Sequence, residues 1–406
     1  MGSMARRWRS RYTRTRAVTD GVRITSMGTK RIGICHQRFG QGVDVANETK
    51  RSRVTKAARP ATQVKSAIAT KEPNGARVSK DPKPQKLKKI EIKGFKSIES
   101  ASVELRDLNV VIGANGAGKS NLIGTFKLLE RYADGLLRVH VADDKDYFLH
   151  HGSKTTHKIT LGLAFEGQKY GFTLKPERET LVPADDLPKP VRDAAIKWVV
   201  YHFDDMSDQS PARRIANIDD CRFLRRDAAN LPAFLYWMQE RKPVPFRMIE
   251  EHVRLVAPFF ECFVLAPHPL NENKIKLEWR QKGSDAKFNA FSLSDGTLRF
   301  ICLAALLLQP EPPPLILLDE PELGLHPFAI NVLAEMLEAA SMHSQVIIAT
   351  QSVTLLSNFE PNDVIVAEHN GTKTTFKRLD EKELESWLED YSLGDLFEKN
   401  VLGGGP

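Results

Sequence analysis

The chain is poor in paired cysteines and in long apolar runs. Its 406 residues contain four cysteines, Cys35, Cys221, Cys262 and Cys302, which lie far apart and form no CxxC pair. This spacing argues against a zinc site and a disulfide framework, so we expect reduced thiols and a cytoplasmic protein. No stretch of about 18 residues is uninterruptedly apolar, so we expect no membrane-spanning segment. Internal repeats and long heptad runs are also missing, which excludes a solenoid and a coiled-coil arm.

Acidic residues are scarce in the first part of the chain and abundant in the rest. Residues 1–90 contain 23 Lys and Arg against 5 Asp and Glu, whereas the remaining residues contain 36 against 46. The formal net charge of +8 therefore describes neither part, because a basic leader precedes an acidic body. We expect residues 1–87 to be disordered, partly as a cloning scar or an upstream start; a functional nucleic-acid-binding arm is the alternative.

Alternating and continuous apolar runs place the folded body at residues 88–406. A helix is predicted at 119–132, and the pair "KITLGLAFE" and "KYGFTL" that follows it is typical of antiparallel strands. The order predicts an α/β protein with a first lobe over 88–180, a helical and inserted region over 180–310 and a last lobe over 311–406. A further helix is predicted at 231–239, and other strands are predicted at 90–92, 102–105, 110–112, 259–265, 274–279, 315–318, 346–349 and 363–367.

The stretch "GANGAGKS" at residues 113–120 follows a predicted strand and opens a predicted helix. Gly116 and Gly118 let backbone N–H groups close around a β-phosphate. Lys119 adds a positive charge for the β- and γ-phosphate oxygens, and the Ser120 hydroxyl suits Mg²⁺. The pattern predicts a nucleotide site, and residues 113–120 are called the cradle below.

Two adjacent carboxylates, Asp319 and Glu320, follow the aliphatic run 315–318. A buried strand that ends in carboxylates at the carboxyl edge of a sheet is where α/β proteins bind ligands. Because successive strand residues point to opposite faces, the two acids can have different roles. We expect Asp319 to hold Mg²⁺ and Glu320 to orient or deprotonate the attacking water.

A second helix start lies in "FSLSDGT", residues 291–297, ahead of the apolar stretch 298–308. Ser294 fits the cap position of this helix, and the start of a helix leaves backbone N–H groups suited to an anion. One chain therefore carries two helix starts directed at phosphate.

The three motifs, in this order, resemble the nucleotide-binding domain of the ABC ATPase class. "IEIKGFKSI" and "GANGAGKSNLI" resemble the soluble SMC, RecF and OLD branch of that class. "AANLPAFLYWM", "LDEPELGLHP" and "YSLGDLFEKNVLGGGP" are similar to small bacterial AAA-family ATP-binding proteins, which commonly sit beside a TOPRIM-type or other nuclease in defence operons. The resemblance implies a P-loop NTPase of ABC type, with a mixed central sheet, an antiparallel β lobe and a helical signature lobe.

Site residues carry over from this resemblance by motif. The nucleotide-binding residues it implies are Gly113, Asn115, Gly116, Gly118, Lys119, Ser120 and Asn121, with Lys96 of "GFKS" approaching from the first strand. It implies Mg²⁺ on Ser120 and Asp319, and catalysis by Glu320. Ser294 and Gly296 would be the signature, which in this class binds the γ-phosphate held by the other subunit. ATP and Mg²⁺ are thus the implied cofactors, and a head-to-tail dimer is the implied active unit.

The sequence departs from the pattern of this class at three places. Asp295 stands in the signature where glycine is commonest, which puts an anion near the incoming phosphate. Gln351 in "IIATQS" replaces a switch histidine; a glutamine can donate a hydrogen bond to the γ-phosphate or orient water, or it is a structural amide after the strand. No glutamine loop is visible, and His150 or His151 in "FLHHGSK" is its candidate substitute, unless both are polar loop residues.

We therefore expect an ATP-dependent dimeric switch that controls a DNA transaction by regulating a nuclease in anti-phage or mobile-element defence. A RecF-like repair ATPase is the alternative. The ATP-binding subunit of a transporter is a third reading, which the opening motif and the missing membrane segment disfavour. The chain continues for about 55 residues after "ATQS", too few for a fused nuclease domain, so we expect the effector to be another polypeptide.

Overall fold

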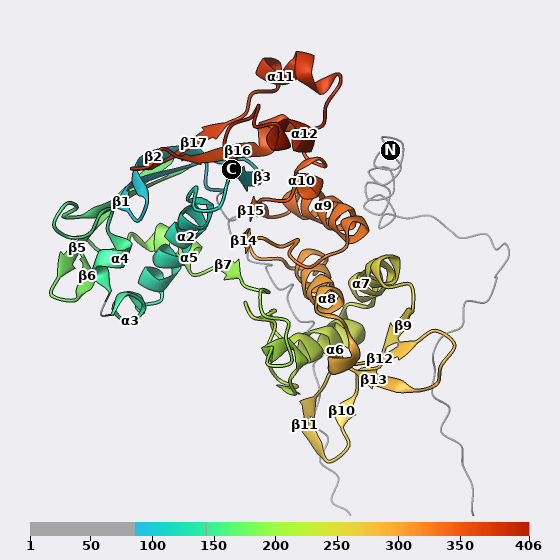
Figure 1. Ribbon diagram of the computed structural model, residues 1–406. Coiled ribbons are helices and arrows are strands. Elements are labelled where there is room, and N and C mark those ends of the chain that lie inside the picture. The colour runs from blue at the N-terminus through green and yellow to red at the C-terminus, as the bar shows by residue number, and fades with distance from the viewer. Residues whose placement is uncertain (1–85, 143, 406) are drawn as a thin grey trace, which may run out of the picture. The chain divides into compact units, whose positions relative to one another are not determined.

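A computed structural model describes residues 86–142 and 144–405 of the chain (Figure 1). The expectations for residues 1–85 lie outside the described residues. Leu87 is already buried, and its backbone N–H and C=O both hydrogen-bond to the Gln345 side chain. The ordered body therefore includes the last residue assigned to the leader.

Continuous aliphatic runs form a six-stranded central sheet in the order β17-β16-β3-β15-β14-β7. The strands are β3 (Leu108–Ile112), β7 (Trp198–Tyr201), β14 (Leu315–Asp319), β15 (Gln345–Thr350), β16 (Val364–His369) and β17 (Thr374–Arg378). All neighbours are parallel except β17, which pairs antiparallel with β16. Such runs suit a parallel sheet because both of its faces are covered. Val111 and Leu317 face one apolar core, called the first core below. Val110 and Leu318 face the other, called the second core.

A second sheet is antiparallel, with the order β2-β1-β4-β5-β6. Its strands are β1 (Lys89–Phe95), β2 (Ile98–Glu104), β4 (Ile159–Phe165), β5 (Gln168–Glu177) and β6 (Thr180–Pro183). The predicted pair β4 and β5 is confirmed, with Leu161 opposite Phe172. Alternate residues of β1, β4 and β5 are buried against the first core, as a half-covered sheet requires.

Helix α2 (Lys119–Ala133) is shared by this sheet and the central sheet, because its apolar side enters the first core. Leu122, Phe126 and Leu129 on that side are each 0% exposed, as the periodicity predicts. The short helices of the same lobe are α3 (Leu137–Val141), α4 (Lys145–Phe148) and α5 (Lys189–Ala195). The cradle thus lies where the two sheets share a core.

Helices cover the other face of the central sheet and form the second core (Figure 1). They are α6 (Leu231–Arg241), α7 (Pro243–Val256), α8 (Asp295–Leu307) and α9 (Pro327–Ser341). Two three-stranded sheets join them: β8 (Ala216–Asn217) with β10 (Pro267–His268) and β11 (Asn271–Ile275), and β9 (Phe260–Phe263) with β12 (Glu278–Gln281) and β13 (Lys287–Asn289). Single turns of 3₁₀ helix lie at η1 (Pro211–Arg213), η2 (Ala290–Ser292) and η3 (Pro361–Asp363).

The α/β fold with a mixed central sheet and an antiparallel lobe is confirmed, and most predicted elements are present. The single strand predicted at 274–279 is wrong, because the chain leaves one small sheet after Ile275 and enters the other at Glu278. The sequence analysis also missed β7 and α7, in the stretch where prolines interrupt the periodicity. Among the described residues, no helix is long and apolar enough to cross a membrane.

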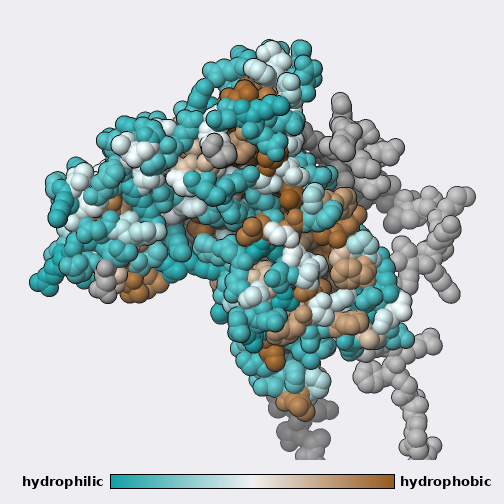
Figure 2. Space-filling view, in the orientation of Figure 1, coloured by the Kyte–Doolittle hydropathy of each residue, from teal (hydrophilic) through white to brown (hydrophobic). Residues whose placement is uncertain are grey.

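The chain finishes with α10 (Val353–Leu356), α11 (Glu381–Leu388) and α12 (Leu393–Glu398). Helix α12 packs closely on α10, because a Cβ added to Gly394 would lie 2.6 Å from the Val353 carbonyl oxygen. Figure 2 shows apolar side chains gathered over the region of α9 and α10, while the visible face of the antiparallel lobe is mostly hydrophilic.

Candidate nucleotide-binding site

The cradle is a tight loop that connects β3 to α2. Gly116 and Gly118 have φ angles of 79° and 101°, which glycine adopts far more easily than other residues. Gly113 has no room for a side chain, because an added Cβ would lie 2.4 Å from the Ala367 carbonyl oxygen. The loop therefore needs glycine for two reasons, backbone conformation in one part and close packing in another.

Lys119 places its ammonium inside the loop. Its Nζ donates hydrogen bonds to the carbonyl oxygens of Gly113 at 2.7 Å and Ala114 at 3.0 Å. Burial lowers the pKa of Lys119, and the nearby carboxylates, led by Glu320, act in the opposite direction. The phosphates of a bound nucleotide would place further negative charge beside this partly desolvated cation and favour its charged form.

Two hydroxyl groups that the sequence analysis missed support the cradle from the side. Thr374 Oγ1 donates to the Ala117 carbonyl at 3.0 Å and lies 2.7 Å from Ser97 Oγ. Asn121 Nδ2, at the start of α2, donates to the same Ser97 hydroxyl at 2.7 Å. A Cβ at Gly118 would lie 2.3 Å from Thr374 Oγ1. The hydroxyl of a residue far along the chain therefore fixes the glycine before Lys119, and no local pattern signals it.

The tail after α12 also reaches the cradle. Leu402 is buried in the second core, and the Gly404 N–H donates to Glu368 Oε1 at 2.9 Å. A Cβ added to Gly404 would lie 3.3 Å from Gly113 Cα. The segment 400–405 therefore packs against the first glycine of the cradle and the end of β16.

Asp319 and Ser120 lie together as predicted, and their chemistry fits Mg²⁺. The Ser120 hydroxyl hydrogen-bonds to the Asp319 carboxylate, whose pKa burial raises. The other carboxylate oxygen, Oδ1, is buried and has no hydrogen-bond partner among the described residues. Carboxylate and hydroxyl oxygens are ligands that Mg²⁺ accepts together with water and phosphate oxygens. An orphaned carboxylate oxygen beside a hydroxyl is thus a fitting half-site for this ion.

Glu320 lies just beyond β14 and leaves the strand direction. Strand β14 ends at Asp319, and Glu320 has a φ of 43°, so a left-handed turn as well as strand alternation separates the two acids. Its backbone N–H donates to the Ala349 carbonyl at 2.8 Å. Gln351 Nε2 donates to the Glu320 carboxylate and, at 2.8 Å, to Asn115 Oδ1. The structure therefore joins three predicted site residues, Glu320, Gln351 and Asn115, in one hydrogen-bonded network.

A third carboxylate, Glu322, was missed by the sequence analysis. It is 8% exposed and accepts a hydrogen bond from Thr350 Oγ1, while its Oε2 is buried without a hydrogen-bond partner among the described residues. Burial raises the pKa of Glu322. Thr350 is the residue before Gln351, so Glu322 connects the loop after Glu320 to the end of β15. The repeated acid in "DEPE" was the available signal.

Lys96 and the two histidines lie together beside the cradle. The Lys96 Nζ is 4.0 Å from the centroid of the Tyr147 ring, over its face. The His150 ring hydrogen-bonds to the Lys96 carbonyl oxygen at 2.8 Å, and the His151 ring to the Thr372 carbonyl oxygen at 3.2 Å. Both histidines thus brace neighbouring turns, and a nucleotide contact of Lys96 or a glutamine-loop role for either ring stays a prediction.

Ser294 caps α8, as its sequence position predicts. Its Oγ accepts a hydrogen bond from the Thr297 N–H at 3.2 Å. Gly296 has no room for a side chain, because an added Cβ would lie 2.4 Å from the Gly324 carbonyl oxygen. Among the described residues, no hydrogen bond joins Ser294 to the cradle, so the two helix starts are separate places in one chain (Figure 1).

Comparison with known proteins agrees with this geometry. Residues 86–220 match a family model described as an AAA ATPase domain. Residues 174–357 match one described as an AAA domain, putative AbiEii toxin, Type IV TA system. Two curated relatives are the phosphate import ATP-binding proteins PstB of Ehrlichia ruminantium strains Gardel and Welgevonden, each 27% identical over 144 residues. That match covers 30% of this chain and 55% of each relative, so the chain spans about half the length of the curated relatives it matches.

Solved structures match more of the chain. An SMC head bound to the C-terminal winged-helix domain of ScpA is 16% identical, with a TM-score of 0.55 over 74% of this chain and 99% of that one. A second, from Pyrococcus furiosus, is an SMC head with an extended coiled coil bound to the C-terminal domain of ScpA; it is 16% identical, with a TM-score of 0.53 over 75% and 98%. The fold is that of an SMC head. The two family models, which match different parts of the chain, are both described as AAA domains.

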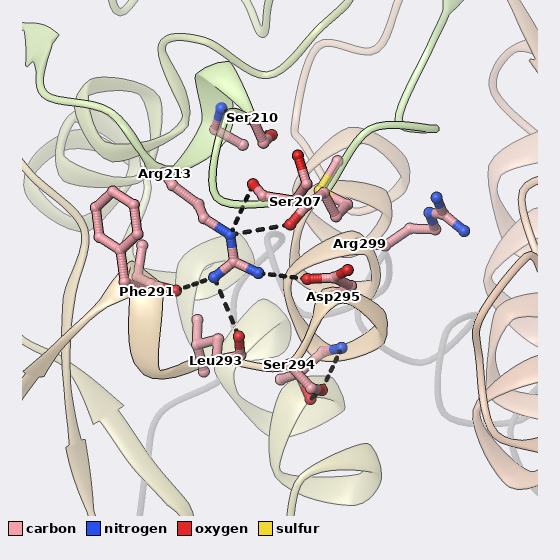
Figure 3. Close-up of polar contacts among 12 residues, drawn as sticks. Ser207, Ser210, Arg213, Phe291, Leu293, Ser294, Asp295 and Arg299 are labelled. Atoms are coloured by element: carbon pink, nitrogen blue, oxygen red, sulfur yellow. Dashed lines mark hydrogen bonds and ion pairs between the residues drawn. The ribbon is translucent and has the colours of Figure 1, made fainter.

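The candidate signature rests on an arginine that the sequence analysis did not identify. Arg213, at the end of η1, donates from Nε to the Met206 carbonyl at 2.9 Å, and from a terminal nitrogen to the Leu293 carbonyl at 3.0 Å (Figure 3). Its other terminal nitrogen donates to Asp295 Oδ1 at 2.7 Å. Asp295, the anion that the sequence analysis places near the incoming phosphate, is thus paired with a buried cation.

Proposed function

We propose that the protein is a Mg²⁺-dependent ATPase that works as a dimeric switch. The observation that carries this proposal is the Glu320–Gln351–Asn115 network, which joins an acid, an amide and the cradle itself. An acid held beside the γ-phosphate position can activate water, and the amide can orient that water or the phosphate. Lys119 binds the phosphates in this scheme, and Ser120 with Asp319 holds the ion. Mg²⁺, when bound, would neutralise phosphate charge and orient the oxygens.

The proposed dimer is head-to-tail, with the signature of one chain acting on the ATP of the other. Ser294 is exposed, and among the described residues no hydrogen bond joins it to the cradle of its own chain. Three large apolar side chains are exposed on neighbouring segments: Phe291 on η2 at 46%, Leu323 on the loop after Glu320 at 52%, and Phe328 at the start of α9 at 51%. Leu323 belongs to the loop that packs on Gly296 and follows Glu320. The surface beside the signature is therefore apolar enough to pack against a second copy.

Mixing two inactive variants tests this arrangement. Lys119→Ala removes the phosphate-binding charge from its own cradle, and Ser294→Arg obstructs the γ-phosphate of the partner. In a mixed dimer both lesions fall on one interface, and the other interface has an intact Lys119 and an intact Ser294. We expect the mixture to recover phosphate release, up to about one working site per mixed dimer if the two sites act independently.

No recovery, with mixed dimers demonstrated by cross-linking, would contradict the trans arrangement or show that both sites must act together. Dimers of each variant with the wild-type chain separate these two outcomes. If one intact interface is enough, those dimers are active; if both must act, they are inactive as well.

We also propose that this ATPase acts on nucleic acid, because an excess of cations converges beside α2. Lys127 lies on α2, and burial together with the neighbouring Arg131 and Arg226 holds its pKa below the usual value. Lys96, His140 and His202 approach Lys127 from three other segments, and these groups are called the basic cluster below. Of the facing acids, Glu130 is ion-paired with Arg226, and Asp204 lies 3.9 Å from His202. This half-buried excess of positive charge suits phosphate groups of a nucleic-acid backbone.

Binding of labelled single- and double-stranded DNA over a salt series tests the basic cluster. The double variant Lys127→Glu/Arg131→Glu should lower affinity by about tenfold or more at low salt and flatten the salt dependence. Lys282→Glu/Lys287→Glu, at two exposed lysines beside the β12–β13 turn, makes the same change in net charge away from the cluster and is the matched control. Equal losses in the cluster variant and the control would contradict a localised site.

For the biological role, we propose regulation of a second polypeptide, a nuclease, in defence. The support is the match to a family described as a putative AbiEii toxin of a Type IV TA system, together with matched SMC heads that were solved bound to ScpA domains. A RecF-like repair ATPase is the second candidate, favoured by the basic cluster. The transporter reading draws on the PstB matches, which cover only 30% of this chain. Co-expression with the product of a neighbouring gene, followed by a nuclease assay with and without ATP, separates these roles.

A further inference from the structure

Arg213 is a buried cation surrounded almost entirely by the segments next to the signature. Its side chain is 2% exposed, whereas the side chain of its ion-pair partner Asp295 is 68% exposed. Besides the Met206 and Leu293 carbonyls and Asp295, the guanidinium donates to the carbonyl oxygens of Ser207 and Ala290. One side chain therefore ties the turn 206–207, the 3₁₀ turn before α8 and the first residue of α8 (Figure 3).

The charge at this place matters because a phosphate would have to approach it. Asp295 is the first residue of α8, directly after the cap Ser294. A carboxylate there is favourable to the helix dipole, yet it repels a second anion at the same helix start. The buried Arg213 guanidinium compensates the charge of Asp295, while Ser294 and Asp295 themselves are exposed.

The geometry points to Arg213 as the positioning residue of the signature: it neutralises Asp295 and fixes the 290–295 segment, so that Ser294 can take the γ-phosphate of a partner chain's ATP. This inference rests on the proposed head-to-tail ATPase and deepens it. It also gives the Asp295 departure a physical reason, because the aspartate completes an ion pair with a cation that holds the loop. Arg213 acts through Ser294 and the α8 backbone and needs no contact with the nucleotide.

The first test separates catalysis from binding and charge from packing. Arg213→Gln leaves Asp295 uncompensated, so kcat should fall about tenfold or more while the ATP affinity of the isolated chain changes less than about twofold. The double variant Arg213→Gln/Asp295→Asn removes both charges and should regain a measurable part of the lost kcat. The matched control is Arg225→Gln, which breaks an ion pair with Asp220 at 2.7 Å on the surface and should keep the wild-type rate.

The second test asks on which chain's ATP the lesion acts. Mixed with Lys119→Ala, Arg213→Gln should restore phosphate release, as Ser294→Arg does. Mixed with Ser294→Arg, it should restore nothing, because both lesions damage the same half of the composite site. If Arg213→Gln unfolds, as judged by its melting transition, Arg213→Lys replaces it: a lysine keeps the charge but loses the fork of donors, and the same pattern is expected with a smaller loss.

Three results would overturn the inference. First, Ser294→Arg could complement Lys119→Ala while Arg213→Gln or Arg213→Lys does not. Arg213 would then act on the ATP site of its own chain and not on that of the partner. A double variant no more active than Arg213→Gln would remove the neutralisation argument. Failure of Ser294→Arg itself to complement, with the wild-type-containing dimers active, would remove the trans arrangement of the proposed function and this inference with it.

Discussion

Glu320 shows how much one backbone angle contributes to the site. A left-handed conformation costs a residue other than glycine about 1 to 2 kcal/mol, so it persists only where the surroundings hold it. Here the Glu320 N–H is fixed by the Ala349 carbonyl and its carboxylate by Gln351. The turn directs Glu320 to Gln351 and Asn115, while Asp319 stays with Ser120.

For Asp319→Asn we predict a higher free energy of unfolding without nucleotide and weaker binding of Mg²⁺. Asp319→Asn removes a carboxylate charge that burial disfavours, and it leaves an amide that can still accept from Ser120. The free energy of unfolding without nucleotide should therefore rise by about 1 kcal/mol. The stabilisation by Mg²⁺ and ATP should be largely lost, because an amide is a poor ligand for this ion.

Thermal melts of the wild type and Asp319→Asn, with and without ATP and Mg²⁺, measure both effects. Glu360→Gln, an exposed acid at the start of η3, is the control for removing one negative charge elsewhere. An Asp319→Asn protein that keeps the full Mg²⁺-dependent stabilisation would contradict the metal assignment.

At the scale of elements, the sequence predicts what local patterns encode. The cradle, α2 and the aliphatic strands β14 and β15 follow from glycine spacing and continuous apolar runs, and all are present. Strand β7 and helix α7 were not predicted, because prolines interrupt the apolar pattern around them and tertiary contacts decide their state.

The supporting roles of Arg213 and Thr374 were not predicted for a different reason. Each residue supports a motif more than 80 residues away, and a single sequence holds no signal for such a contact.

The tail after α12 gives a prediction for an element that no motif marks. Gly404 has a φ of 68° and packs against Gly113, so Gly404→Ala strains the backbone and also pushes on the cradle. We expect ATP affinity to fall by about threefold to tenfold, the size of effect that a packing contact of 1 kcal/mol or slightly more produces.

Gly371→Ala separates strain from contact. Gly371 has a φ of 89° with open space around its Cβ position, so its variant carries comparable strain without touching Gly113. Titrations with a fluorescent ATP analogue compare the two. Equal affinities in both variants would show that the tail does not act on the cradle.

At the scale of the whole molecule, the sequence divides into a basic leader and an acidic body, and the described part of the body contains a basic cluster beside α2. We predict that deleting residues 1–84 leaves the steady-state ATPase rate unchanged, because the described body contains the cradle, the candidate signature, and the carboxylates Asp319 and Glu320. DNA affinity at low salt should fall, since the leader's charges no longer release counterions from phosphate. A deletion variant that loses ATP turnover while it melts like the full chain would show that the leader belongs to the site.

The proposed dimer would explain why one chain has two helix starts suited to phosphate. In that dimer, α2 would bind the chain's own ATP, and α8, held by Arg213 and by the loop after Glu320, would face a second copy. Glu320 lies next to the loop that packs on Gly296. In the proposed dimer, hydrolysis and separation of the two chains would therefore be coupled through contacts of a few residues.

The most direct measurement of this account is the mass and nucleotide content of Glu320→Gln with ATP and Mg²⁺, by light scattering coupled to size exclusion. The amide keeps the hydrogen bond to Gln351 possible but cannot accept a proton from water. We predict a stable dimer that retains two unhydrolysed ATP molecules, while the wild type returns to its nucleotide-free state as it turns over. A Glu320→Gln protein that stays monomeric, or that hydrolyses ATP at the wild-type rate, would contradict the account.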